Sequence, residues 1–276
     1  MDKWSHIRRR CIENINTFIP LRQKDIIADM HTHTIYSRHA FSTLKENLDA
    51  AILHGMKYIA NTDHRYSSTL SVIDQKNEEA RISLINRVNP YYGTSVISSM
   101  EFNLNREFKA SDKSICNKLV KYRLFGLHSW FYDIPNMNLN VLPILFELAI
   151  ADYSCNAFAH IEREINQMLH GSYGIEVTPT IRDILKEIVD IAKYYDVLLE
   201  VNESSLKNDN YGNTERMRCW LEMACDNGNR IVLGSDAHFC EEVGVFTNSI
   251  ALLNELQYPR DLIINCNEEE IKKFLI

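Results

Sequence analysis

The stretch DMHTHTIYSRHA at 29–40 holds three histidines within nine residues, and neutral imidazole is the commonest metal ligand in proteins. His31 and His33 lie two residues apart, so in a strand their side chains share one face and could bind one ion. Asp236 and His238 repeat this spacing near the other end of the sequence. A set of imidazole and carboxylate ligands without cysteine favours zinc, manganese or iron in a reactive site over a purely structural zinc.

Short apolar runs alternate with helical patterns along the chain, and this alternation positions the histidines. The runs that predict strands are Asp25–Met30, Tyr58–Asn61, Thr94–Met100, Arg123–Leu127, Cys155–Ala159, Val197–Val201 and Arg230–Gly234. Helical spacing of apolar residues is clearest at 43–55, 141–152 and 179–195, and we expect a helical excursion within 65–93. Strand followed by helix, repeated seven times, predicts parallel strands in a closed or nearly closed α/β barrel.

Each predicted strand ends at one or more polar side chains that can bind a metal or contact a substrate. In chain order they are His31 and His33 with His39 beyond, Asp63 and His64, Glu101, His128, His160, Glu200 and Asn202, and Asp236 and His238. The carboxyl ends of parallel barrel strands meet at one rim, where active sites of such barrels lie. A single histidine at a strand end is more often a structural polar residue than a ligand. His6, His54 and His170 fall outside the strand ends, and we assign them a structural role. The whole set predicts a multinuclear metal site.

Composition limits the class of protein. The chain has 276 residues, of which 45% are hydrophobic and 24% charged, as in an ordinary globular protein. Its net charge of −7 disfavours broad electrostatic binding to nucleic acid. Seven scattered cysteines without a C-x-x-C pair argue against a disulfide framework. We expect a cytoplasmic protein without a membrane span, with an N-terminal helical extension at 1–24 and one barrel domain at 25–276.

The polar motifs resemble those of the PHP (polymerase and histidinol phosphatase) superfamily of metal-dependent phosphoesterases, and are closest to a compact bacterial phosphatase-like subgroup. The motifs that carry the resemblance are HTHTIYSRH (31–39), NTDH (61–64), MEF (100–102), His128, His160, EVNESS (200–205), GSDAH (234–238) and INCNEEEIKKFL (264–275). The resemblance implies a distorted (β/α)7 TIM-like barrel with a trinuclear metal centre.

The resemblance also implies how the ligands divide among three divalent ions, with Glu101 as a bridge. The first ion would be bound by His31, His33, Glu101 and Asp236. The second would be bound by Glu101, His128 and His160, and the third by His39, His64 and His238.

We expect hydrolysis of a small-molecule phosphomonoester through a metal-bridging hydroxide, with Glu101 and Asp236 as the catalytic carboxylates. Three arginines beside ligands are candidates for binding phosphate: Arg163 first, then Arg38 and Arg65. Asn202 would contact substrate or water. Asp63 and Glu200 are interpreted as groups that orient imidazoles.

Three other functions are alternatives to a phosphomonoesterase. A phosphodiesterase or exonuclease would act on nucleotides or short oligonucleotides, so nucleic acid is a partner only as a short substrate. An amidohydrolase-type barrel also begins with H-x-H, but it would leave His39 and His64 without a role. A metal-stabilised binding module would hold the ions without turnover. The sequence makes no prediction of the oligomeric state.

Overall fold

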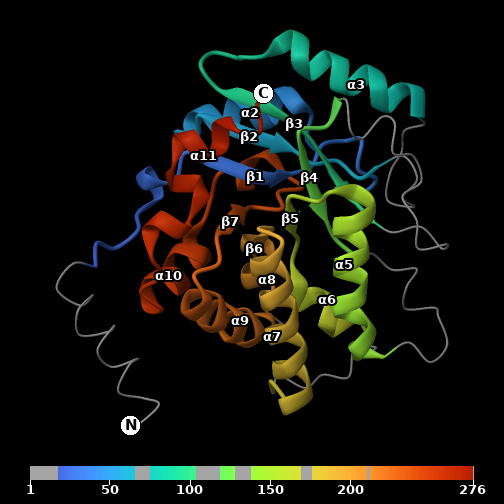
Figure 1. The fold of residues 1–276 in the computed structure, drawn as a ribbon. Helices are drawn as coiled ribbons and strands as arrows, with labels where there is room; N and C mark the ends of the chain where they lie inside the picture. Colours follow the sequence, from blue (N-terminus) through green and yellow to red (C-terminus); the bar gives the residue numbers. More distant parts are fainter. Residues whose placement is uncertain are drawn as a thin grey trace.

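Seven parallel strands lie at the centre of the computed structural model, with helices around them (Figure 1). The structure describes residues 18–65, 75–103, 119–127, 138–168, 176–209 and 212–275. The strands are β1 (Ala28–Thr32), β2 (Tyr58–Asn61), β3 (Ser95–Phe102), β4 (Tyr122–Phe125), β5 (Ala157–Phe158), β6 (Leu198–Asn202) and β7 (Ile231–Gly234). Each strand pairs with the next along the chain, so their carboxyl ends share one rim.

The seam between β1 and β7 is nearly closed by backbone contacts at this rim. Thr32 forms a parallel bridge with Ala237. The Asp236 amide donates to the His31 carbonyl at 2.8 Å, and the His33 amide donates to the Ala237 carbonyl at 2.9 Å. The predicted fold class, a distorted α/β barrel of seven strands, is therefore confirmed.

The buried side chain of Asn265 bridges the same seam below the rim. Its Nδ2 donates to the carbonyls of Ala28 and Leu233, both at 2.9 Å, and its Oδ1 accepts from the Leu233 amide at 2.7 Å. Its own carbonyl accepts from the Ile27 amide at 2.9 Å. One amide thus satisfies backbone groups that a continuous strand ladder would otherwise pair.

Some of the helices begin at capping residues. The α-helices are α2 (Leu44–Leu53), α3 (Gln75–Val88), α5 (Leu142–Tyr153), α6 (Ile161–Met168), α7 (Pro179–Tyr194), α8 (Glu203–Lys207), α9 (Asn213–Asn227), α10 (Thr247–Glu255) and α11 (Glu268–Lys272). Short 3-10 turns occupy Gln23–Asp25, Leu139–Val141, Cys240–Glu242, Arg260–Leu262 and Ile264–Cys266. Thr43 and Glu46 form a capping box on α2, and the Thr178 side chain accepts from the third amide of α7.

Two apolar layers hold the barrel together. The larger packs the outer faces of the strands against the surrounding helices. The smaller fills the barrel interior, and Phe274 and Leu275 from the C-terminal segment pack against it. The ring of Phe274 meets Tyr122 edge-on at 5.1 Å between centroids. Apolar side chains therefore fill one end of the barrel, and polar side chains gather at the other.

The expected elements differ from the observed ones mainly at two strands. β1 begins at Ala28 and not at Asp25, because Gln23–Asp25 form a 3-10 turn, and it extends through His31 to Thr32. β5 has two residues where five were expected, because its ladders with β4 and β6 involve only Ala157 and Phe158. The excursion within 65–93 holds α3. Of the expected N-terminal extension, 1–17 lies outside the described residues.

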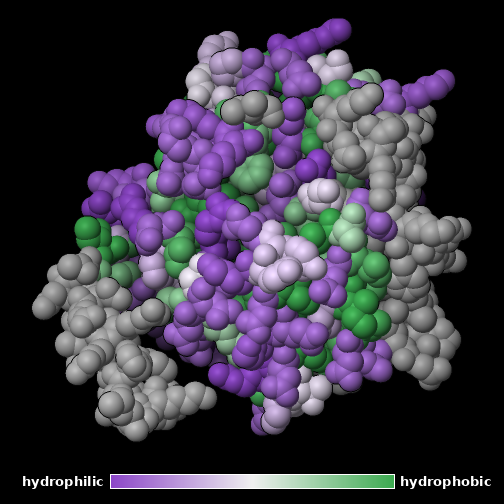
Figure 2. Space-filling view, in the orientation of Figure 1, coloured by the Kyte–Doolittle hydropathy of each residue, from purple (hydrophilic) through white to green (hydrophobic). Residues whose placement is uncertain are grey.

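The visible face is mainly hydrophilic, with hydrophobic side chains gathered over α5 (Figure 2). Ile144 on that helix is 53% exposed. Within the described part of the chain, every helix is too short or too polar to cross a bilayer.

Candidate metal centre

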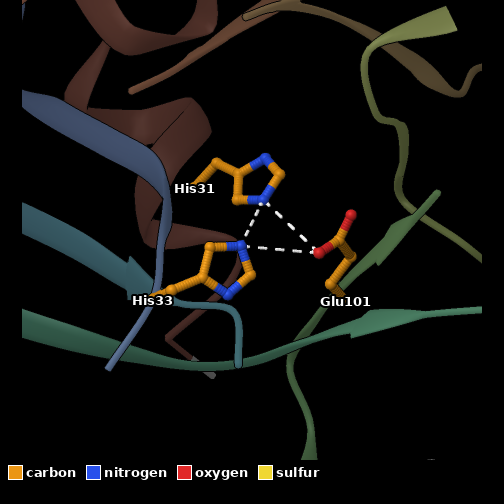
Figure 3. Close-up of side chains that lie close together, drawn as sticks. All are labelled: His31, His33 and Glu101. Carbon is orange, nitrogen blue, oxygen red and sulfur yellow. Dashed lines mark hydrogen bonds and ion pairs between the residues drawn. The ribbon is translucent and has the colours of Figure 1, made fainter. Parts of the chain in front are cut away.

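The ends of β1, β3 and β7 bring four buried side chains together at the rim. Three of them, His31, His33 and Glu101, are drawn in Figure 3, and the fourth is Asp236. The Nε2 atoms of His31 and His33 lie 3.0 Å apart. Glu101 Oε2 lies 3.6 Å from the first and 3.5 Å from the second. Asp236 Oδ1 lies 3.4 Å and 3.3 Å from the same two nitrogens. Two imidazoles and two carboxylates thus converge on one point.

The other nitrogen of each imidazole identifies the tautomer. His31 Nδ1 lies 2.6 Å from Glu200 Oε1, a carboxylate that can only accept. His33 Nδ1 lies 3.0 Å from Ser37 Oγ, and that hydroxyl donates to Asp63 Oδ1 at 2.9 Å. Ser37 therefore accepts from His33. When both rings are neutral, as in ion binding, each carries its hydrogen on Nδ1, and the two Nε2 lone pairs face each other.

Four acceptor atoms in contact repel one another unless a cation lies among them, so this donor set fits a divalent ion. A tetrahedral ion with bonds of about 2.0–2.1 Å separates its ligand atoms by about 3.3 Å, close to the spacings here. Ligand-capable atoms of His31, His33 and Glu101 lie within 4.8 Å of one another, as do those of His33, Asp236 and His238.

The second oxygen of Glu101 faces a different imidazole. Glu101 Oε1 lies 3.1 Å from His160 Nε2, and His160 Nδ1 lies 2.9 Å from Glu164 Oε1. The two oxygens of one carboxylate are therefore directed to two groups of imidazoles. His128, the third expected ligand of the second group, lies outside the described residues.

The three histidines expected at the third position line one cavity of about 100 Å³. The His39 ring lies 5.3 Å from the His64 ring and 4.3 Å from the His238 ring, between centroids. His64 Nδ1 lies 3.0 Å from Glu101 Oε2. His238 Nδ1 lies 2.8 Å from the Asp236 carbonyl, a contact that orients its Nε2 away from that carbonyl. The three rings are neighbours at the mouth of the centre.

The charges at the centre favour an added cation. Burial lowers the pKa of His31, but Glu200 and Asp236 outweigh it and raise that pKa well above its usual value. Burial opposes ionisation of Asp236, yet the charges of His31 and Arg163 hold its pKa well below the usual range. Burial lowers the pKa of His33 to about 3. The carboxylates of Glu200 and Asp236 thus favour a proton on His31, at the place where an ion would lie.

Two of the expected ligands have left-handed backbone conformations. His160 has φ of 30° and Asp236 has φ of 54°, each two residues beyond the end of its strand. The His160 amide donates to Glu200 Oε2 at 3.0 Å, and the Asp236 amide donates to the His31 carbonyl at 2.8 Å. These bonds hold an unfavourable conformation that directs both side chains into the centre.

Arg163 and Asn202, both expected at the substrate, contact Asp236. Arg163 donates from Nη1 at 2.6 Å and from Nη2 at 2.9 Å to Asp236 Oδ2, and it also lines the 100 Å³ cavity. Asn202 Nδ2 donates to Glu200 Oε2 at 3.1 Å and to Asp236 Oδ2 at 3.3 Å. The Asn202 amide is therefore directed to carboxylates of the centre.

The other two arginines lie away from this cavity. Arg65 is buried, with its guanidinium carbon 5.6 Å from the centroid of the Phe102 ring. Arg38 is exposed. Neither is among the described side chains that line the 100 Å³ cavity. Phosphate binding by these two residues stays a prediction.

Two groups that orient the imidazoles were not predicted from the sequence. Glu164 lies one helical turn after His160, a spacing that could have indicated the contact. Ser37 stands between His33 and Asp63, so Asp63 acts on the imidazole through the hydroxyl and not directly. The predicted role of Glu200 agrees with its contact to His31.

Glu164→Ala is expected to weaken metal binding by about 10–100-fold, because His160 loses the carboxylate that orients its ring. Competition with a chromogenic chelator measures this affinity. Glu187→Ala on the exposed face of α7 is the control and should leave the affinity unchanged. Equal affinities for the two variants would show that Glu164 does not act on the centre.

A protein-family model described as PHP domain matches residues 29–204. The match begins within β1, two residues before His31, and extends to the end of β6.

Curated relatives match over nearly the whole chain. A probable phosphatase of Caldanaerobacter subterraneus subsp. tengcongensis is 26% identical over 267 residues, which are 91% of each chain. A probable phosphatase of Proteus mirabilis is also 26% identical and covers 90% of this chain and 93% of its own.

Solved structures share the fold. Histidinol phosphate phosphatase from Lactococcus lactis, solved with zinc, L-histidinol and phosphate, has a TM-score of 0.62 at 16% identity, covering 87% of this chain and 93% of its own. The putative histidinol phosphatase from Listeria monocytogenes has the same TM-score at 14% identity, and the match covers 79% of this chain and 97% of that one.

Proposed function

This chain belongs to the PHP domain family, and we propose on that basis that it hydrolyses a small-molecule phosphomonoester at a centre of three divalent ions. The observation that carries the proposal is the Glu101 carboxylate, whose Oε2 faces His31 and His33 while its Oε1 faces His160. A carboxylate in this position can bridge two ions. His39, His64 and His238 provide imidazoles for a third.

The predicted enzyme class, a hydrolase of phosphoric esters, is confirmed by the family and by relatives named probable phosphatases. The zinc, L-histidinol and phosphate bound to the Lactococcus lactis structure support a divalent metal and a small phosphate ester. The proposed ions are zinc, manganese or iron, since imidazole and carboxylate ligands accept all three.

The side chains around the 100 Å³ cavity position the phosphate and the ligands. Arg163 lines this cavity and donates twice to Asp236 Oδ2, which leaves Oδ1 for an ion. Its side chain is 27% exposed, so it can also approach a phosphate oxygen. The Asn202 side chain also donates to Asp236 Oδ2 and so helps to orient that carboxylate.

When bound, the ions supply Lewis-acid chemistry: they lower the pKa of water and neutralise charge on the phosphoryl oxygens. Water adds to phosphorus, the bond from phosphorus to the ester oxygen breaks, and phosphate and an alcohol are released. Glu200 fixes His31 and Ser37 fixes His33 throughout, so the ligands need no rearrangement during the reaction.

Removal of metal is expected to lower hydrolysis of p-nitrophenyl phosphate by at least about 10³-fold, because the chain's own groups cannot replace the lost positive charge. Zinc, manganese and ferrous iron are then added back separately, and the metal content is measured by mass spectrometry. The proposal predicts about three ions per chain at full activity. Undiminished hydrolysis by metal-free protein would contradict it.

A labelled single-stranded oligonucleotide in the same assay tests the phosphodiesterase alternative. We expect slow or absent cleavage beside rapid hydrolysis of the monoester. Faster cleavage of the oligonucleotide would favour the exonuclease.

A further inference from the structure

A second, larger cavity adjoins the metal centre. It has a volume of about 450 Å³ and lies between α8 and the segment that follows β7. Asp236 and His238 line both this cavity and the 100 Å³ cavity. A phosphate at the centre would therefore have the larger space beside it for the alcohol part of the ester.

An aromatic ring forms one wall of this larger cavity. Phe239 is 47% exposed, and its ring is stacked on Phe41, which is 70% exposed, with centroids 4.8 Å apart and an interplanar angle of 8°. Large apolar rings are usually buried in globular proteins, so two exposed rings stacked beside a reactive centre indicate a binding surface.

Hydrogen bonds of two backbone amides join the segments that carry the two rings. The Phe41 amide donates to the His238 carbonyl at 2.9 Å. The Cys240 amide donates to Ser42 Oγ at 2.8 Å. The segments that carry the rings are thus joined on both sides of the stack, and the ring surface is formed before any ligand binds.

The charge of the larger cavity disfavours an anionic alcohol. Lys207 is the one cation among the described side chains that line it, and this ammonium is paired with Glu242. Glu203 is buried and accepts hydrogen bonds from Asn248 and Ser249. Glu241 is exposed and adds a negative charge to the same wall. A second phosphate or a carboxylate on the substrate would meet no unpaired positive charge here.

We propose that the substrate is a phosphomonoester whose alcohol carries a planar ring without negative charge, and that this ring stacks on Phe239 while the phosphate lies at the metal centre. The inference rests on the proposed phosphomonoesterase activity and adds the chemical class of the leaving group. The stacked rings supply the apolar surface, and the acidic wall selects against anionic rings.

Adenosine 5′-monophosphate and ribose 5-phosphate provide a matched pair, because both release a ribose 5′-oxygen and only the first carries a planar base. With the metal-loaded protein we expect kcat/KM to be at least about tenfold higher for the nucleotide. Phe239→Ala should reduce this ratio by about 5–100-fold, and Phe239→Tyr, which keeps the ring, should preserve it. Damage to the centre itself would lower both rates and leave their ratio unchanged.

Uridine 5′-monophosphate and orotidine 5′-monophosphate test the charge, since they differ by one carboxylate on the base. We expect kcat/KM to be at least about fivefold higher for the uridine ester than for the orotidine ester. Glu241→Gln should reduce this ratio. Equal kcat/KM values within both pairs would overturn the inference. So would turnover of ribose 5-phosphate by a protein that hydrolyses none of the three nucleotides. No turnover of any ester by the metal-loaded protein would instead contradict the phosphomonoesterase activity itself.

Discussion

Glu101→Gln is expected to lower kcat/KM for a phosphomonoester by at least about 10³-fold and to reduce the metal content of the purified protein. The substitution keeps the size of the side chain but removes the charge that faces His31, His33 and His160. An amide can offer one oxygen and not two, so the two groups of imidazoles lose their shared ligand. Steady-state kinetics and elemental analysis on the same preparation measure both effects.

Glu222→Gln on the exposed face of α9 is the matched control for Glu101→Gln, since it removes the same charge far from the ligands. It should retain full activity and metal. The thermal midpoint of each variant shows whether the barrel is intact. A Glu101→Gln protein with normal metal content and nearly normal kcat would exclude a bridging role for this carboxylate.

Gly234→Ala is expected to destabilise the protein by about 3 kcal/mol and to weaken metal binding, although this glycine is not a ligand. A Cβ at this position would lie 2.2 Å from Glu200 Oε1 and 2.4 Å from His31 Cβ. The His31 Cβ is attached to a buried strand and cannot move aside, so the added methyl displaces the Glu200 carboxylate from its hydrogen bond with His31. Denaturant unfolding and metal titration measure the two effects.

Gly55→Ala is the control for Gly234→Ala. Gly55 lies just after α2 with φ of 75° and nothing within 4 Å of a new Cβ, so only backbone strain of about 1 kcal/mol is expected. Its metal affinity should equal that of the native chain. If Gly234→Ala also loses only about 1 kcal/mol and binds metal normally, the close approach of Gly234 to His31 and Glu200 does not constrain the centre.

The order of the strands and the convergence of ligands could be predicted because both follow from local patterns. His31 and His33 lie two residues apart, and this period of two holds even though β1 lies about three residues later than expected. The predicted boundary was wrong because the apolar run continues upstream into a segment that precedes the strand. Hydrophobicity identifies buried residues, whereas the pairing with β2 and with the loop after β7 decides where the strand lies.

The partner of each supporting group could not be predicted from the sequence, because the contacts join residues that are distant along the chain. Glu200 was expected to orient an imidazole, but its particular partner, His31, lies 169 positions away, and Arg163 meets Asp236 across 73. Arg163 was predicted at the phosphate, and its double contact with a carboxylate depends on where α6 begins relative to β7. The stack of Phe41 on Phe239 arises in the same way, from two loops that meet only in the folded barrel.

The seam between β1 and β7 also has a consequence for the time course of folding. The bond from Asn265 to Ala28 joins residues 237 positions apart, and loop-closure entropy makes such contacts slow to form. β1 to β6 can pair step by step with near neighbours, whereas the last gap closes only when the two ends of the sheet meet. His31 and Asp236 lie on opposite sides of that gap. We therefore expect the centre to be assembled only when this seam closes, so that a chain that has paired six strands still lacks it.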